Sequence, residues 1–370
     1  MYAQNFNTSK MKILRLASTL NSTSAPYNQF SLGFKNDFQQ TFCSLLENEV
    51  TIDEKIIGYH NSGSIFRMLR LLKSLLKNND YDVIHIHSGV TGIIFILALF
   101  PLNMHMLSKT VFTLHNSWNV LKTRNQVLNF IVMLCSKKVC TCGISSRNSI
   151  PKFIGFFINK KTSPIVNGFD HNRIDNVQFK NTRISHFDET SNLKIVCVGA
   201  LNNTKNQIAL LEALKVMKLD AEVIFLGDGI NKSRLIDFSK TISDPTNISF
   251  EGRVSRELAI EFMLEADISI SLSTGEGLPI AVLESIYAGC YSILSSIPPH
   301  FEISPPKERC YFVNPFDQSE IIHSLTYVQK NIEDIRSSRD LSKEHAVKNF
   351  SVEKMLSEYH KVYDWLIHKR

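Results

Sequence analysis

Two glutamates separated by seven residues stand in the segment GEGLPIAVLE, residues 275–284. Glu276 lies in a glycine-containing turn, and Glu284 lies about one and a half turns into an apolar helix predicted to begin at Pro279. A carboxylate at each of these places can accept hydrogen bonds from neighbouring hydroxyl groups of a sugar or a ribose. The alternative is that Glu276 is a solvated loop residue and Glu284 a surface residue of the helix.

The turn between these elements has the features of a phosphate site. The apolar run at 266–273 predicts a strand, so residues 274–278 connect the carboxyl end of a strand to the start of a helix. The free N–H groups of the first helical turn and the positive end of the helix dipole favour a phosphate there. Gly275 and Gly277 allow the backbone to approach a ligand closely. The turn could therefore hold a sugar, a phosphate and a ribose, which are the parts of a nucleotide sugar.

A histidine closes an apolar run in the first half of the chain. His115 ends the predicted strand at 110–115 and is followed by Asn116. Because ligands of parallel sheets bind outside the carboxyl ends of the strands, this position predicts a site residue. The alternative is a core histidine whose ring nitrogens are hydrogen-bonded within the fold.

Strand and helix patterns alternate along the chain, which predicts parallel sheets covered by helices on both faces. The predicted strands lie at 11–17, 82–87, 110–115, 193–200, 221–227, 247–252, 266–273 and 291–296, and the clearest helices at 64–79, 206–217, 256–266 and 320–332. The strands form two groups. The polar, aperiodic residues 168–192 between them are interpreted as a linker.

The predicted fold class is α/β, with two doubly wound Rossmann-like domains that face a central cleft, where the ligand is expected. The predicted bounds are a disordered tail at 1–10, a first domain at 11–175 and a second domain at 190–350. A last helix within 351–370 is expected to pack back across the interface.

Composition excludes several classes of protein. No run reaches the roughly 18 apolar residues of a membrane span, and the longest, GIIFILALF (92–100), predicts a core helix. The first ten residues lack the apolar centre of a secretory signal. The seven cysteines show neither a zinc spacing nor a Cys-x-x-Cys redox motif, and are expected to be reduced, buried thiols. The expected location is the cytoplasm.

Charge is unevenly distributed between the two halves. Residues 1–170 carry 18 Lys and Arg against 8 Asp and Glu, a balance of +10, and the remaining residues carry 23 against 27, a balance of −4. Basic and apolar residues mix at 122–138 and 156–161. The predicted helix at 65–77 contains no acid and four basic residues, Arg67, Arg70, Lys73 and Lys77. We expect the first half to contact the anionic inner face of the cytoplasmic membrane peripherally. The alternative is a domain-packing helix with a solvated basic edge.

Several motifs together resemble those of a known family. In chain order they are YDVIHIH (81–87), FTLHNSW (112–118), IVNGFD (165–170), VGALNNTKNQIALLEAL (198–214), LGDG (226–229), FEGRVSRELAIEFMLEADI (250–268) and STGEGLPIAVLESIYAGCYSILSSIPPHFEI (273–303). This set resembles the retaining glycosyltransferases of family 4, or glycosyl transferases group 1, over nearly the whole chain from Met11. The resemblance implies the GT-B architecture, transfer of a sugar from a nucleotide donor with retention of anomeric configuration, and no bound metal.

The resemblance also implies roles for individual residues. Lys205 matches a lysine that stabilises charge on the leaving diphosphate, Glu276 the carboxylate beside the donor sugar, and Glu284 the one on the ribose. His115 matches a histidine near the reaction centre. Further donor-side candidates are Gly199, Asn202, Arg253, Gly275, Gly277, Leu278 and Pro279, and acceptor-side candidates are Ser22, Thr23 and Asn116. Ala200 stands where many members have an arginine, and Arg253 or the Pro279 helix is expected to compensate.

The predicted function is therefore a metal-independent, retaining glycosyltransferase of hexosyltransferase type. It would use a nucleotide-sugar donor, a UDP-sugar by preference, and a glycan or lipid-linked acceptor in bacterial surface polysaccharide assembly, as for capsule, O-antigen or exopolysaccharide. Two alternatives stay open: a nucleotide-sugar epimerase on a GT-B scaffold, and a non-catalytic nucleotide-binding protein. No cofactor or metal and no nucleic-acid partner is expected.

Overall fold

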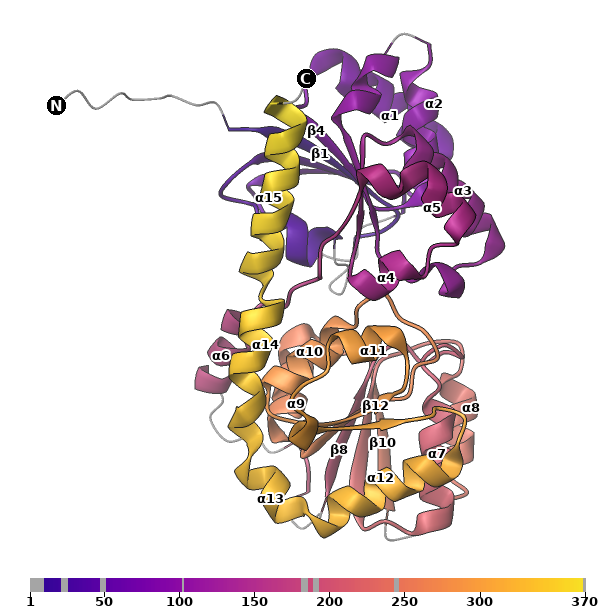
Figure 1. Ribbon diagram of the computed structural model, residues 1–370, viewed down its shortest axis with the longest axis vertical. Helices are drawn as coiled ribbons and strands as arrows, with labels where there is room; N and C mark the ends of the chain where they lie inside the picture. Colours follow the sequence, from indigo (N-terminus) through magenta and orange to yellow (C-terminus); the bar gives the residue numbers. More distant parts are fainter. Residues whose placement is uncertain are drawn as a thin grey trace, which may run out of the picture. The chain divides into compact units, whose positions relative to one another are not determined.

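The computed structural model describes residues 10–20, 26–46, 51–101, 103–180, 186–188, 193–242 and 246–368. They form two compact units, each built around its own sheet (Figure 1). Unit 1 comprises Met1–Cys142, Ser146–Ile165 and Met355–Arg370, and unit 2 comprises Gly143–Ser145 and Val166–Lys354. The chain therefore passes through unit 1, then unit 2, and returns to unit 1 with its last helix.

Unit 1 contains a seven-stranded sheet in the order β3-β2-β1-β4-β5-β6-β7, in which every pair is parallel. The strands are β1 (Lys12–Ala17), β2 (Gln39–Ser44), β3 (Ile56–His60), β4 (Val83–Ile86), β5 (Thr110–Leu114), β6 (Lys138–Thr141) and β7 (Thr162–Pro164). The helices along this part of the chain are α1 (Ile65–Asn78), α2 (Gly89–Leu99), α3 (Thr123–Cys135), α4 (Ile144–Asn148) and α5 (Lys152–Ile158). Short helical turns are η1 (Pro26–Ser31), η2 (Met104–Lys109), η3 (Trp118–Val120) and η4 (Asn159–Lys161).

Unit 2 contains a six-stranded parallel sheet in the order β10-β9-β8-β11-β12-β13. The strands are β8 (Lys194–Val198), β9 (Ala221–Leu226), β10 (Thr246–Gly252), β11 (Ile268–Ser271), β12 (Tyr291–Ser295) and β13 (Cys310–Val313). The helices are α6 (His171–Lys180), α7 (Gln207–Met217), α8 (Lys232–Ser239), α9 (Arg256–Glu265), α10 (Ile280–Tyr287), α11 (Pro298–Glu302), α12 (Gln318–Lys330), α13 (Ile332–Ser337), α14 (Lys343–Phe350) and the start of α15 (Val352–His368), with the turns η5 (Lys307–Arg309) and η6 (Arg339–Ser342).

Both sheets follow one winding pattern. The first strand of each lies in the interior, the next two lie on one side of it and the later strands on the other. The winding therefore reverses between β1 and β4 and again between β8 and β11. At such a point the two connections leave toward opposite faces of the sheet, which opens a ligand-sized crevice at the carboxyl ends of the strands.

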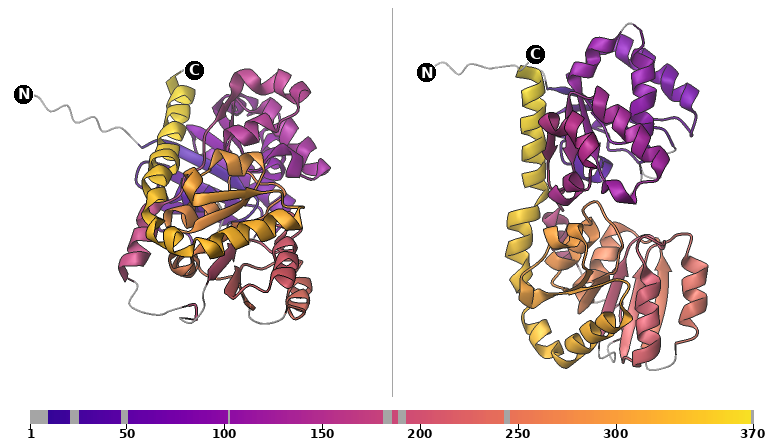
Figure 2. Two further views of the ribbon diagram at one scale, coloured as in Figure 1. Left: turned by 60° about the horizontal axis from the view of Figure 1, so that its bottom comes forward. Right: turned by 45° about the vertical axis from the view of Figure 1, so that its right-hand side comes forward.

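Helices cover both faces of each sheet (Figures 1 and 2). In unit 1, apolar side chains of α1, α2, α3 and α5 form one core with Leu14 and Leu16 of β1. In unit 2, α7 and α12 share a core with Ile195 of β8, and α9 shares a second core with Val196. Because successive strand residues point to opposite faces, both faces of β8 are buried.

The second face of the unit 1 sheet is covered by the C-terminal helix α15, which lies beside β1 and β4 in Figure 1. Tyr359 and Tyr363, one turn apart on this helix, are completely buried. The ring of Tyr359 packs edge-on against Phe30 with centroids 4.6 Å apart, and its hydroxyl lies 3.1 Å from Thr113 Oγ1 on β5. The hydroxyl of Tyr363 lies 2.6 Å from His85 Nδ1 on β4. The last helix thus supplies part of the interior of unit 1.

The prediction of two Rossmann-like α/β sheets is confirmed. Each of the eight predicted strands and four predicted helices corresponds to an element of the structure. Sequence analysis missed β2, β3, β6, β7 and β13. Of these, β3, β7 and β13 are edge strands and β2 is rich in polar residues, so their strand state follows from pairing with a neighbour rather than from an apolar run.

The predicted linker at 168–192 differs from the structure, because α6 occupies His171–Lys180 and Tyr287 on α10 donates a hydrogen bond to Asp175 at 2.9 Å. The chain also leaves unit 1 after Ile165, before the predicted end of the first domain at residue 175. Of the tail predicted at 1–10, residues 1–9 lie outside the described residues.

The apolar run at 92–100 falls in α2, where Ile94, Phe95 and Leu99 are buried in the unit 1 core. Within the described part of the chain, no helix is both long enough and apolar enough to cross a membrane.

Replacing Tyr359 by alanine should test how much α15 stabilises unit 1. Tyr359→Ala removes a fully buried ring and leaves a cavity, so the free energy of unfolding should fall by about 3–5 kcal/mol. Lys361→Ala, two residues further on and exposed, should change it by less than about 0.5 kcal/mol. Urea unfolding followed by circular dichroism measures both, and equal effects of the two changes would contradict a buried role for α15.

Candidate functional site

The candidate site of unit 2 lies where the winding of its sheet reverses. The loop at 199–206 follows β8, and the loop at 272–279 follows the neighbouring strand β11. The backbone N–H of Thr274 donates to the carbonyl oxygen of Thr204 at 2.8 Å, which joins the two loops directly. Residues distant in sequence therefore meet at the carboxyl ends of two adjacent strands.

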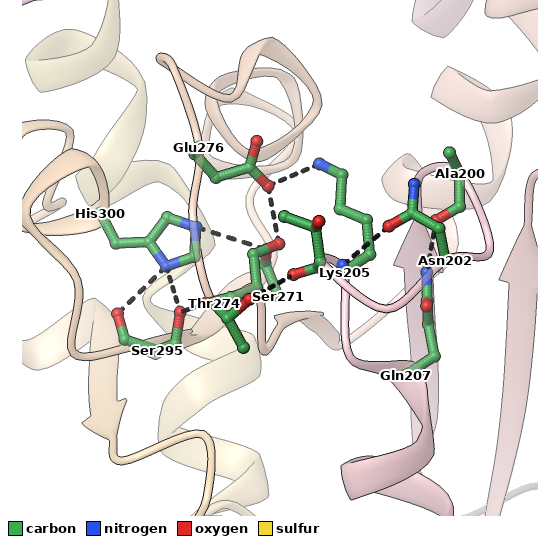
Figure 3. Close-up of polar contacts among 11 residues, drawn as sticks. Ala200, Asn202, Lys205, Gln207, Ser271, Thr274, Glu276, Ser295 and His300 are labelled. Carbon is green, nitrogen blue, oxygen red and sulfur yellow. Dashed lines mark hydrogen bonds and ion pairs between the residues drawn. The ribbon is translucent and has the colours of Figure 1, made fainter. Parts of the chain in front are cut away.

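An ion pair between these loops is the centre of the site (Figure 3). Lys205 Nζ lies 2.5 Å from Glu276 Oε1, and Ser273 Oγ donates to the same carboxylate oxygen at 2.6 Å. The Lys205 side chain is 26 % exposed and that of Glu276 is 11 % exposed. Both charges are thus mostly removed from water but remain accessible to a ligand.

Hydrogen bonds between side chains and the backbone fix the conformation of the loop that contains Lys205. Asn202 Oδ1 accepts from the backbone N–H of Lys205 at 3.0 Å, and Gln207 Nε2 donates to the carbonyl oxygen of Ala200 at 2.9 Å. Gly199 has a φ of +150°, and a Cβ there would lie 3.4 Å from Lys205 Cε. The lysine therefore crosses directly over a position where glycine is favoured.

Sequence analysis missed His300, which lies behind the ion pair and is completely buried. Ser295 Oγ donates to the carbonyl oxygen of Ser273, so the 2.9 Å contact between His300 Nδ1 and Ser295 Oγ must be a bond donated by the imidazole. The other nitrogen, Nε2, then accepts from Ser271 Oγ at 3.3 Å. Burial lowers the pKa of His300 to about 4, which keeps the ring neutral. Its position after two prolines in SSIPPHFE gave no distinctive sequence signal.

The helix after the second loop begins one residue later than predicted. Pro279 takes the N-cap position without a side-chain cap bond, and Ile280 is the first residue of α10. Leu278 and Pro279 are buried, and the glycines Gly275 and Gly277 in the loop are buried with them. The uncapped start of α10 therefore stands beside the loop that holds Glu276.

Glu284 lies further along α10 and is 5 % exposed. Its carboxylate is not a surface group, because Arg256 donates to Oε1 from Nε at 2.8 Å and from a second nitrogen at 2.5 Å. Arg256 is the first residue of α9, whereas Arg253, which sequence analysis proposed for the donor phosphate, is exposed three residues earlier. The two arginines stand three residues apart in the same motif, so the sequence does not show which of them reaches Glu284. The direction in which α9 runs decides this.

In unit 1, a cavity of about 290 Å³ opens where its sheet reverses. Ser18, after β1, and Ser88, after β4, face each other there with their hydroxyl oxygens 2.6 Å apart. His115 and Asn116 after β5 also line this cavity, and α3 contributes Arg124, Asn125, Leu128 and Asn129. His115 Nε2 lies 2.9 Å from His87 Nδ1, while His115 Nδ1 and His87 Nε2 have no hydrogen-bond partner.

A buried network of polar side chains packs against these histidines. Arg15 donates to His85 Nδ1 at 3.0 Å, so this nitrogen accepts and the opposite nitrogen, Nε2, donates to Thr113 Oγ1 at 2.7 Å. The rings of His85 and His87 lie 3.9 Å apart. Burial lowers the pKa of His85 and His87 well below the ordinary value and that of His115 to about 4. All three rings are therefore neutral at pH 7.

The structure gathers the predicted donor-side residues Lys205, Glu276, Gly199 and Asn202 into one place, and it gathers His115 and Asn116 into another within unit 1. Arg253 takes no part in the ion pairs described above. The acceptor-side candidates Ser22 and Thr23 lie outside the described residues. Across those described residues, no group of three or more His, Cys, Asp or Glu side chains is arranged to hold a metal ion.

Two family models match successive parts of the chain. The family model described as Glycosyltransferase Family 4 matches residues 40–173, and the model described as Glycosyl transferases group 1 matches residues 178–346. The chain belongs to glycosyltransferase family 4. The first model covers most of unit 1, and the second covers both loops of the candidate site in unit 2.

Three relatives are similar in sequence to part of this chain. The capsular polysaccharide biosynthesis glycosyltransferase CapH of Staphylococcus aureus is 28 % identical over 62 % of this chain and 64 % of its own length. The putative glycosyltransferase EpsD of Bacillus subtilis is 24 % identical over 66 % of each chain, and the O-antigen biosynthesis glycosyltransferase WclY of Escherichia coli is 27 % identical over 60 % of each. Each match spans less than two thirds of the relative.

Solved structures show the same fold at low sequence identity. Sucrose-phosphate synthase from Thermosynechococcus elongatus superposes with a TM-score of 0.76 at 12 % identity, over 98 % of this chain and all of that one. A glycosyltransferase from Rickettsia africae gives 0.76 at 17 %, over 97 % and 99 %. HepE from Anabaena, in complex with UDP and glucose, gives 0.74 at 14 %, over 96 % and 99 %. The GT-B fold predicted from the sequence is thereby confirmed.

The buried histidines predict that this family 4 protein loses stability in acid. Their pKa values in the folded state lie below that of an unfolded histidine, so the unfolded chain binds protons first as the pH falls. The free energy of unfolding should therefore decrease from about pH 6.5 downward, by about 1.4 kcal/mol per pH unit for each such histidine until its folded pKa is reached.

Urea unfolding at pH 7 and pH 5 measures this decrease. His115→Gln should reduce the pH slope by one histidine's share, whereas His105→Gln, at an exposed position, should leave it unchanged. A slope that is equal in the wild type and in His115→Gln would contradict a neutral His115.

The pair of Arg256 and Glu284 gives a further stability prediction. Arg256→Met leaves a buried carboxylate without its cation, so the free energy of unfolding should fall by about 3–5 kcal/mol. The double variant Arg256→Met, Glu284→Gln should recover part of this loss, because no buried charge remains. Arg253→Met, at the exposed position three residues earlier, should cost less than about 1 kcal/mol. Equal losses for the two arginines would refute the pairing.

Proposed function

We propose that this protein transfers a sugar from a UDP-sugar to a glycan or lipid-linked acceptor during assembly of a bacterial surface polysaccharide. The observation that carries the proposal is the ion pair of Lys205 and Glu276 beside the uncapped start of α10. A cation, free helical N–H groups and a carboxylate in one place suit a diphosphate followed by a sugar with several hydroxyl groups. The printed names of CapH, EpsD and WclY support polysaccharide assembly, and the UDP bound to HepE supports a UDP donor.

In this proposal Lys205 exchanges its partner when the donor binds. Its amine, held by Glu276 in the structure, stabilises the negative charge that builds on the diphosphate as the bond to the sugar breaks. Glu276 then accepts hydrogen bonds from the sugar, and its position is maintained by Ser273. His300 holds Ser271 and Ser295 beneath this loop, so we assign it a positioning role.

The remaining donor contacts are assigned to neighbouring groups. Glu284 accepts hydrogen bonds from Arg256 at Oε1, and we propose that its other oxygen, Oε2, binds the ribose. The N–H groups of α10 replace the cation that Ala200 does not supply, because the charge of Arg256 is already paired with Glu284. The diphosphate charge is met by Lys205 and by the N–H groups of α10, without a metal ion.

We propose retention of anomeric configuration through attack on the same face from which the diphosphate departs, with the leaving phosphate oxygen accepting the proton of the acceptor hydroxyl. A double displacement would require a carboxylate within bonding distance of the opposite face of the sugar. The acceptor is assigned to the unit 1 cavity, where His115 and Asn116 offer polar groups. The protein is placed in the cytoplasm, with peripheral contact to the inner face of the membrane.

A panel of nucleotide sugars separates this function from its alternatives. Incubation in the presence of EDTA, with mass detection of products, should release UDP from one of the donors, with water taking the sugar in place of the acceptor. An altered nucleotide sugar without release would indicate an epimerase, and a thermal shift without turnover would indicate a binding protein. A glycosyl adduct on a carboxylate of this chain would refute the same-face mechanism.

Lys205→Met tests the assignment of the leaving-group cation. Release of UDP should fall by at least about 100-fold, the cost of removing one preorganised group that stabilises the transition state. Lys215→Met, on the exposed face of the following helix α7, should keep the wild-type rate. Initial rates at saturating donor measure both variants, and a Lys205→Met enzyme as fast as the Lys215→Met control would remove Lys205 from the mechanism.

A further inference from the structure

An apolar row runs along the solvent side of α3. This helix buries Val132 and Met133 in the unit 1 core, yet Val127, Ile131 and Leu134 are 53 %, 39 % and 42 % exposed. Residues four and seven positions apart lie on one side of a helix. The three exposed side chains therefore form one stripe along α3.

The neighbouring helix α5 exposes three phenylalanines. Phe153, Phe156 and Phe157 are 64 %, 84 % and 57 % exposed, whereas Ile154 and Ile158 of the same helix are buried. Phe130 on α3 connects the two helices, with ring centroids 6.0 Å from Phe153 and 6.3 Å from Phe157. We name this surface the α3–α5 patch: Val127, Phe130, Ile131, Leu134, Phe153, Phe156 and Phe157. Several large apolar side chains gathered on one exposed surface mark a contact with another surface.

The sequence around the patch is entirely free of acids. Between Asp82 and Asp170 the chain contains no Asp or Glu and nine Lys and Arg. The basic residues next to the patch in sequence are exposed or half-buried: Lys122 and Arg124 before the α3 stripe, Lys152 at the start of α5, and Lys160 and Lys161 after it. Lys161 Nζ donates to the carbonyl oxygens of Leu134 and Ser136, which places a positive charge at the end of α3. The partner of this surface must therefore be apolar and negatively charged.

We propose that the α3–α5 patch docks on an anionic lipid bilayer. The phenylalanines enter the boundary between headgroups and acyl chains, and the lysines contact the anionic headgroups, as amphipathic surfaces of this composition do. Sequence analysis predicted this contact for α1 and for the mixed basic and apolar segments 122–138 and 156–161, which contain all of the patch except Phe153. Helix α1 exposes two large apolar side chains, Ile65 and Phe66, fewer than the patch does. The inference deepens the proposed peripheral membrane contact and rests on it.

The same helix also connects the patch to the unit 1 cavity. Arg124 stands one turn before Val127, and it lines the cavity together with Asn125, Leu128 and Asn129 of α3. A bilayer beneath the stripe would hold membrane-anchored molecules next to the opening that contains His115. The acceptor is therefore a lipid-linked glycan rather than a free one, and its headgroup would enter between Arg124 and His115.

Flotation with liposomes tests the surface directly. The full-length protein should float with vesicles of phosphatidylglycerol and phosphatidylcholine at low salt and remain unbound with phosphatidylcholine alone. The triple variant Phe153→Ser, Phe156→Ser, Phe157→Ser should lower the bound fraction at least tenfold. Lys152→Glu, Lys160→Glu should weaken binding to the anionic vesicles most strongly at low salt. Two controls, Phe66→Ser and Phe316→Ser, remove other phenylalanines that are 82 % and 78 % exposed and should bind like the wild type.

Release of UDP from the donor in solution separates failure of this inference from failure of the proposed transferase. The triple variant should retain the thermal shift with UDP and the wild-type release of UDP, because none of its changes lies in unit 2. If the wild type floats and the triple variant floats equally, the patch is not the docking surface, although the membrane contact stands. If the wild type stays unbound, both proposals about the membrane fail while the transferase is unaffected. Concentration-dependent dimers that the triple variant abolishes, without flotation, would reassign the patch to contact between copies.

Discussion

The reversal of winding within each parallel sheet is the constraint on which both candidate sites depend. All strands of a parallel sheet end at the same edge, and the two connections at the reversal leave toward opposite faces. In unit 2 this brings the loop of Lys205 against the loop of Glu276, although 71 residues separate them in sequence. In unit 1 the same geometry brings Ser18 and Ser88 together. The chemistry of each site follows from where the strands end, and the loops supply the residues.

Buried polar networks hold these loops in place. His300 has two serines as partners, and the orientation of its ring is set by the single proton of Ser295. Beneath His115, Arg15 and His85 are arranged by Tyr363 from the C-terminal helix. A buried polar group without a partner would cost more than a hydrogen bond contributes, so such networks select one arrangement of side chains. The price is sensitivity to acid, since every ring in them must stay neutral.

Helix α3 combines three tasks through its periodicity. One side, with Val132 and Met133, completes the core, and its first turn supplies Arg124 and Asn125 to the cavity of unit 1. The remaining side carries the apolar stripe. A helix of 13 residues can serve three surroundings because side chains 100° apart point to different places. Membrane contact and acceptor binding would then be properties of one rigid element rather than of separate modules.

The sequence by itself determined the α/β class, the central strands, and the position of the turn at 274–278 between a strand and a helix, because continuous apolar runs, glycines and a proline at a helix start are local signals. It could not identify β3, β7 and β13, whose strand state depends on pairing at a sheet edge. It did not identify Arg256 as the partner of Glu284, and it missed His300. Each of these depends on the direction in which a side chain points after packing. Spacing along the chain predicts which residues share an element, but only tertiary contacts decide which of them are buried, paired or left facing the solvent.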